Sequence, residues 1–121
     1  MNKTKPLVVI NVVGLTHSML GTDTPHISAL AAEGFARPLQ TVFPALTCSV
    51  QSSLLTGLLP REHGIVGNGW YDRELAEVFF WRQSNRLVQG ERLYDAARQI
   101  DPAYTTAKMF WWYNMYADVD Y

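Results

Sequence analysis

A run of β-branched residues closed by a glycine, close to the N-terminus, is the feature that most constrains the fold. Residues 7–13 read LVVINVV, and Gly14 follows them directly. A continuous apolar run of this length, bounded by a breaker, is typical of a strand buried on both faces of a parallel sheet. Residues 76–81 and 104–110 predict two more strands, and the weaker alternation of residues 37–42 predicts a short one.

Three other segments carry helix signals. Residues 25–33 begin with a proline and are followed by Gly34, which is typical of a helix start and stop. Residues 48–56 are small and aliphatic and end at Gly57, and residues 91–100 are amphipathic. Strands that alternate with helices predict an α/β fold, a mostly parallel sheet with helices on both faces. No change of composition marks a linker, so one domain is expected.

The charge balance and the cysteine content restrict the partners. Ten basic residues stand against eleven acidic ones, for a net charge of -1, and no basic run occurs. This composition argues against a nucleic-acid polymer as a partner and favours small molecules. No apolar stretch approaches the roughly 20 residues that span a bilayer, so no membrane partner is expected. The single cysteine, Cys48, cannot form an internal disulfide, which fits a cytoplasmic location.

An aromatic run near the C-terminal end predicts a contact surface. Its members are Phe110, Trp111, Trp112, Tyr113 and Tyr116. Side chains of this kind tend to mark contact surfaces when they are exposed together. We therefore expect self-association through this segment, or packing against a part of the core that lies outside the chain.

Thr47 directly precedes the helix predicted for residues 48–56. A hydroxyl at a helix start lies at the positive end of the helix dipole, beside free backbone N–H groups, where a phosphoryl anion binds naturally. The ordinary alternative is that Thr47 is only the N-cap of this helix. Local chemistry alone favours the cap, because a threonine hydroxyl needs a base or a metal to become nucleophilic near neutral pH.

Two sequence segments in the same order carry a family resemblance. Residues 24–34 read TPHISALAAEG, and residues 41–68 read TVFPALTCSVQSSLLTGLLPREHGIVGN. A threonine followed by a helix ending in Thr-Gly, a proline, His-Gly-Ile and an asparagine resembles the nucleophile region of the type I phosphodiesterase/nucleotide pyrophosphatase family. This family belongs to the alkaline phosphatase superfamily, and its relative phosphonoacetate hydrolase is similar here too. The similarity covers residues 7–71.

The resemblance implies a metal-dependent hydrolase that cleaves phosphodiester or pyrophosphate bonds of a small-molecule phosphate ester or phosphonate. Thr47 would be the nucleophile, forming a covalent phospho-threonine, and also a metal ligand. Asn68 would donate a hydrogen bond to a phosphoryl oxygen, although a glycine-flanked turn residue is its ordinary alternative. Two divalent metal ions, expected to be zinc, would complete the site. His63 lies within the motif and is interpreted as a structural loop residue.

One position departs from the family pattern. The resemblance places a metal-binding aspartate just before Gly14, where this sequence has Val13. Asn11 would point to the same side of a strand, but an amide oxygen is a weak zinc ligand. The resemblance places the other ligands beyond residue 121. We therefore expect residues 1–121 to be the N-terminal portion of an alkaline-phosphatase-like catalytic domain that is inactive alone.

Two alternatives for the function stay open. The sequence TTAK ending at Lys108 resembles a strand of phosphonoacetate hydrolase in which a lysine meets the substrate carboxylate, which would imply hydrolysis of a C–P bond. A lysine at such a position is otherwise solvated or paired with an anion. The substitution at Val13 instead motivates a relative that keeps the fold for binding and has lost catalysis.

Overall fold

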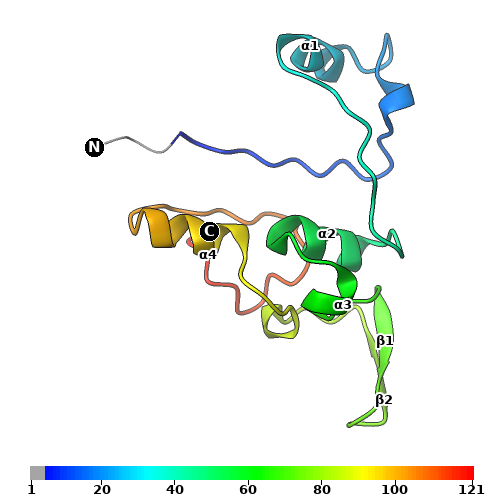
Figure 1. Ribbon diagram of the computed structural model, residues 1–121, viewed down its shortest axis with the longest axis vertical. Helices are drawn as coiled ribbons and strands as arrows, with labels where there is room; N and C mark the ends of the chain where they lie inside the picture. The colour runs from blue at the N-terminus through cyan, green and yellow to red at the C-terminus, as the bar shows by residue number, and fades with distance from the viewer. Residues whose placement is uncertain (1–4) are drawn as a thin grey trace. The chain divides into compact units, whose positions relative to one another are not determined.

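The computed structural model describes residues 5–121, and the described chain divides into two compact units between Gln40 and Thr41. The first unit contains η1 (His17–Met19) and α1 (Pro25–Glu33), as Figure 1 shows. The second unit contains α2 (Thr47–Thr56), α3 (Pro60–His63), β1 (Gly69–Asp72), β2 (Glu77–Phe80), η2 (Asn85–Leu87) and α4 (Leu93–Ile100). In this described part, no helix is long and apolar enough to cross a membrane.

The helix predicted for residues 25–33 is confirmed as α1. Pro25 occupies its first position, where the missing N–H costs nothing. Thr24 precedes it and organises the loop instead of capping the helix. Its Oγ1 accepts from the Gly21 N–H at 3.0 Å and donates to the Met19 carbonyl at 2.9 Å. These contacts fix the turn through which the chain enters α1.

The strands predicted for residues 7–13, 37–42 and 104–110 are wrong for the described structure, which assigns none of them to a sheet. The six aliphatic side chains of residues 7–13 are 48% to 79% exposed, in place of the expected burial. A strand exists only by hydrogen bonding to a neighbouring strand. Within residues 5–121 the first of these segments has no such neighbour, and the expected parallel sheet does not form there.

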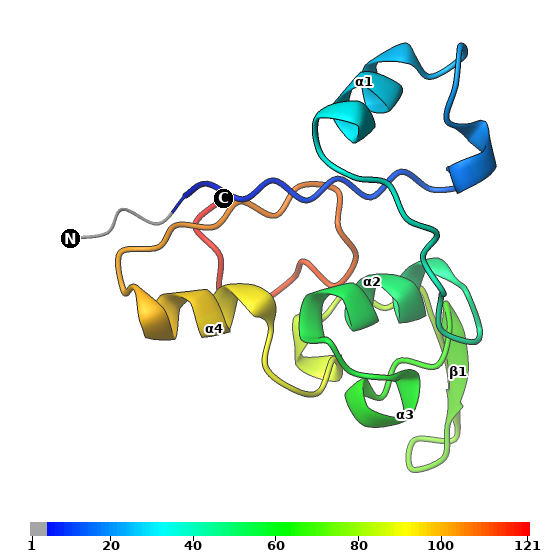
Figure 2. The same cartoon turned by 45° about the horizontal axis from the view of Figure 1, so that its top comes forward.

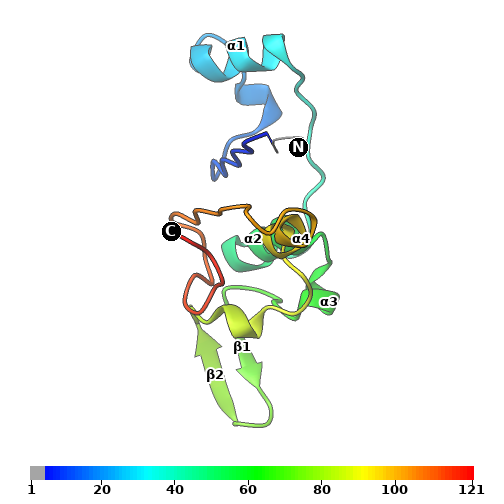
Figure 3. The same cartoon turned by 90° about the vertical axis from the view of Figure 1, so that its left-hand side faces the viewer.

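The sheet of the second unit is a two-stranded antiparallel hairpin of β1 and β2, drawn in light green in Figure 3. The prediction for residues 76–81 is confirmed as β2, whereas β1 lies in a segment for which no strand is predicted. Gly69 pairs with Phe80, and a Cβ on Gly69 would lie 2.5 Å from the Phe80 ring. Only glycine therefore fits at this position, which explains why β1 lacks an obvious strand signal.

The buried core of the second unit is small and is centred on α2. Its members are Cys48, Ile65, Val88 and Tyr113, with Trp70, Leu87 and Trp112 packed against them. The helices α2 and α3 lie side by side, as Figure 2 shows. The aromatic run predicted to be a contact surface divides in two: Tyr113 enters this core, whereas Phe110 is 99% exposed. Part of the run therefore packs within the chain itself.

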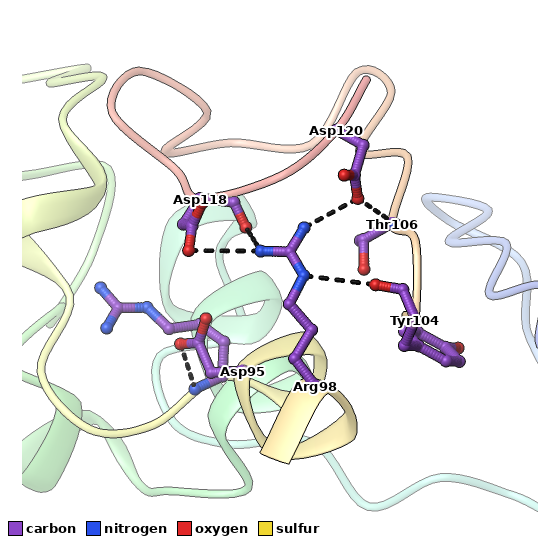
Figure 4. A network of polar contacts seen from close by, with 7 residues as sticks. Asp95, Arg98, Tyr104, Thr106, Asp118 and Asp120 are labelled. Atoms are coloured by element: carbon purple, nitrogen blue, oxygen red, sulfur yellow. Dashed lines mark hydrogen bonds and ion pairs between the residues drawn. The ribbon is translucent and has the colours of Figure 1, made fainter. Parts of the chain in front are cut away.

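The helix predicted for residues 91–100 is confirmed as α4. Arg98 joins α4 to the C-terminal segment by hydrogen bonds and ion pairs (Figure 4). Its guanidinium donates to the Asp118 carbonyl and to Asp120 Oδ2, each at 2.7 Å, and to the Tyr104 carbonyl at 3.3 Å. The Thr106 N–H also donates to Asp120 Oδ2. This N–H and Arg98 hold the pKa of the Asp120 carboxyl below its usual value. Residues 104–121 are thereby held against α4.

Candidate functional site

The helix α2 begins at Thr47, one residue earlier than predicted. Leu46 is the N-cap, with φ of −114° and ψ of 160°, so Thr47 is the first helical residue. The alternative that Thr47 is only a cap is therefore wrong. Thr47 is half-buried, and its hydroxyl takes part in none of the hydrogen bonds found among residues 5–121. This hydroxyl is available to a ligand at the positive end of a ten-residue helix.

The loop that leads into Thr47 is fixed by the first turn of the helix. Ser49 Oγ donates to the Pro44 carbonyl at 2.6 Å and accepts from the Leu46 N–H at 3.3 Å. Ser49 is fully buried, so its hydroxyl must be satisfied by protein groups. These bonds set the direction in which the chain arrives at Thr47.

Asn68 lies at the same helix end. Its Oδ1 accepts from the Cys48 backbone N–H at 3.0 Å, across 20 residues of sequence. Because a backbone N–H can only donate, the amide must turn Oδ1 toward the helix, and its Nδ2 donor remains for another partner. Asn68 is also absent from the described non-glycine residues with positive φ, so it lacks the backbone conformation on which the turn alternative rests. The structure brings Asn68 and Thr47, the two residues predicted for phosphoryl chemistry, to one helix N-terminus.

His63 has a structural role, as its position in the motif predicted. It is fully buried. Its Nδ1 accepts from the Ile65 N–H at 3.1 Å, so Nε2 carries the proton and donates to Ser53 Oγ at 2.9 Å. Burial lowers the pKa of the imidazole. The neutral ring thus links α3 to α2 through Ser53.

The buried His63 predicts a loss of stability in mild acid. Its pKa is lower in the folded than in the unfolded chain, so the unfolded chain binds more protons as the pH falls below about 6.5. The free energy of unfolding should therefore decrease as the pH falls below about 6.5, by at most about 1.4 kcal/mol per pH unit. Urea unfolding at several pH values, followed by tryptophan fluorescence, measures this change in the free energy of unfolding. The variant His63→Gln should lose this slope; parallel curves for the two proteins would contradict the assignment.

Lys108, predicted to bind substrate, is 6% exposed. Its Nζ donates to the Tyr113 carbonyl at 2.7 Å. Burial, and secondarily the charge of Arg92, lower its pKa to about 8. None of the hydrogen bonds and ion pairs found among residues 5–121 joins Lys108 to Thr47 or Asn68. The substrate role of Lys108 stays a prediction.

Cys48, next to Thr47, is an interior residue. Its side chain is fully buried, and burial raises the pKa of its thiol while a hydrogen bond with Tyr113 lowers it less. A thiol that stays protonated is a poor nucleophile. Cys48 is therefore not an alternative nucleophile at this helix end.

The described residues do not make up a metal centre. Residues 5–121 contain no group of three or more His, Cys, Asp or Glu side chains that could hold an ion. Thr47 Oγ1 is one suitable oxygen, but Val13, at the position where an aspartate was expected, offers no ligand atom. The described residues thus supply one ligand of a metal site, Thr47 Oγ1, and do not form a complete site.

A helix N-terminus that presents a hydroxyl and a side-chain amide is the arrangement expected of proteins that bind or transfer phosphoryl groups. The chain belongs to the family described as Type I phosphodiesterase / nucleotide pyrophosphatase, whose sequence model matches residues 7–121. It is also 35% identical over 81 residues to Alkaline phosphatase PafA from Elizabethkingia meningoseptica. That match covers 57% of this chain and 15% of the relative.

These similarities confirm the predicted family. Members of this family are phosphoesterase-type hydrolases of the alkaline phosphatase superfamily, which act on small-molecule phosphate esters and use divalent metal ions. A helical unit with a two-stranded sheet is consistent with a fragment of such a domain. The chain spans only 15% of the length of the relative.

Proposed function

We propose that this chain carries the nucleophile portion of a hydrolase of phosphodiester or pyrophosphate bonds. One observation carries the proposal: the hydrogen bond between the Cys48 N–H and Asn68 Oδ1. It holds the Asn68 amide at the positive end of the ten-residue helix that begins at Thr47. The helix N-terminus, the Thr47 hydroxyl and the Asn68 amide each suit a phosphoryl group. The hydroxyl would attack the phosphorus, and the amide would donate to one of the phosphoryl oxygens.

Thr47 Oγ1 attacks phosphorus in line, and the bond from phosphorus to the leaving oxygen breaks as the new bond forms. Water later hydrolyses the phospho-threonine and regenerates the hydroxyl. No carboxylate or imidazole among residues 5–121 is hydrogen-bonded to Thr47, so the hydroxyl proton goes to a group outside them. The Nδ2 donor of Asn68 stabilises the charge that develops on the phosphoryl oxygen, a contribution typically worth about 10² to 10³ in kcat.

The metal ions are proposed only because the chain belongs to this family. Two divalent ions, proposed to be zinc, would supply charge neutralisation at the phosphoryl group. Thr47 is the one ligand proposed from this chain. We further propose that residues 1–121 are the N-terminal portion of an alkaline-phosphatase-like catalytic domain. The low coverage of the relative supports this, and the chain alone would be inactive.

The test compares this chain with the full-length gene product in the presence of zinc. The substrates are bis-p-nitrophenyl phosphate and phosphonoacetate, and bound metal is counted in the same preparations. Hydrolysis of the diester by the full-length protein, and not by residues 1–121 alone, is the expected result. A preference for phosphonoacetate would replace the proposal with C–P bond hydrolysis. No hydrolysis together with fewer than two bound ions would favour a non-catalytic binding protein.

A further inference from the structure

Asn68 is held from a second side by the end of the hairpin. The Trp81 N–H donates to the Asn68 carbonyl at 2.9 Å. Trp81 directly follows β2 and has φ of 51°, a left-handed conformation that a bulky side chain adopts only when its surroundings impose it. The position of the Asn68 backbone therefore depends on whatever holds Trp81 in this conformation.

Trp112 is the residue that holds Trp81. The two indole rings pack edge to face with their centroids 4.9 Å apart. The Trp112 Nε1–H donates to the carbonyl of Arg82, the residue after Trp81, at 2.8 Å. The Trp112 backbone N–H donates to Gln51 Oε1 at 2.7 Å, and Gln51 lies on α2. A single residue thus joins the end of the hairpin to the helix that begins at Thr47.

We propose that Trp112 is a positioning residue that sets Asn68 against the N-terminus of α2. The proposal rests on the proposed function for its catalytic meaning, although the geometry can be tested without any activity. Trp112 is far in sequence from both α2 and the hairpin. The side-chain bond of Asn68 to the Cys48 N–H alone leaves the amide free to swing. Trp112 supplies the second attachment, through Trp81 on one side and Gln51 on the other.

The first experiment measures amide hydrogen exchange of this chain by NMR for the natural protein and for Trp112→Ala. The Cys48 N–H reports its bond to Asn68, and the Gly57 N–H, bonded to the Ser53 carbonyl at the other end of α2, is the internal reference. We expect exchange at Cys48 to accelerate at least tenfold while exchange at Gly57 changes less than threefold. Phe110→Ala, a change at a fully exposed aromatic of the same run, should alter neither rate.

Equal acceleration at Cys48 and Gly57 would overturn the proposal, because Trp112 would then only stabilise the fold. If Trp112→Ala does not fold, the same two exchange rates are compared in Gln51→Ala. This variant removes the side-chain oxygen that accepts from the Trp112 backbone N–H. In the full-length protein, Trp112→Phe should restore most of the kcat that Trp112→Ala loses, with KM nearly constant. Absence of hydrolysis in all variants together with selective exchange at Cys48 would refute the proposed function and leave the positioning role standing.

Discussion

Replacement of Thr47 by alanine should lower kcat/KM of the full-length protein for a phosphodiester by three or more orders of magnitude. Removal of the catalytic nucleophile of a serine protease costs about 10⁶-fold in kcat. Thr47→Ser keeps a hydroxyl at the same helix end and should keep measurable activity. Unchanged turnover in the alanine variant would refute the covalent mechanism.

The same substitution should barely change stability, and this separates the nucleophile from a structural residue. Loss of a threonine N-cap typically costs about 1 kcal/mol. Here the cap position belongs to Leu46 and the Thr47 hydroxyl makes no capping bond. The free energy of unfolding of Thr47→Ala should therefore lie within about 0.5 kcal/mol of the natural protein. All four tryptophans lie in the second unit, so their fluorescence reports the relevant unfolding.

Replacement of Lys108 by methionine should stabilise the second unit. A fall of the lysine pKa from 10.5 to about 8 corresponds to a cost of about 3 kcal/mol for burying the charged form at neutral pH. The hydrogen bond to the Tyr113 carbonyl that methionine loses has a charged donor and is worth about 1.5 to 3 kcal/mol, but that carbonyl keeps the Asn85 amide as a donor. We expect a net gain of up to about 1.5 kcal/mol at pH 7.

The pH dependence of this gain identifies its cause. The pKa of Lys108 is lower in the folded chain, so the unfolded chain binds more protons between pH 8 and 10.5. The stability of the natural protein should rise with pH above 8, whereas that of Lys108→Met should not. Urea unfolding at pH 7 and pH 9.5 measures both, with the exposed Lys5→Met as the control. A destabilised methionine variant would show that the buried ammonium contributes net stability to the fold.

The helices α1, α2 and α4 could be predicted from sequence because their signals are local, whereas the short helix α3 was not predicted. Proline at the first position of α1 and Gly57 after α2 are such signals. The φ of 70° at Gly57 is a conformation that glycine adopts without strain. The boundaries of α1 were predicted without error, and that of α2 was displaced by a single residue.

The strands could not be predicted in the same way, because pairing depends on residues distant in sequence. Residues 7–13 have the composition of a buried strand and yet find no partner within residues 5–121. The opposite error concerns β1, whose Gly69 reads as a loop residue. Its requirement for glycine comes from the Phe80 ring on the opposite strand, a contact that no local pattern reveals.

The candidate site was predicted from the family resemblance and not from local rules, which favoured a cap at Thr47 and suggested a turn at Asn68. The residues that hold Asn68 were missed altogether. Trp81 was seen only as a strand end and Trp112 only as part of an aromatic run. Their roles follow from contacts across 30 or more residues, such as that between Trp112 Nε1 and the Arg82 carbonyl.

The sole cysteine of the chain is fully buried immediately after Thr47. An alkylating reagent can reach its sulfur only when the first turn of α2 opens or the unit unfolds. The rate at which the reagent labels Cys48 in native conditions therefore measures how often the candidate site opens. The natural sequence already contains a single-position chemical reporter, and the effects of ligands or substitutions on these openings can be timed without introducing a label.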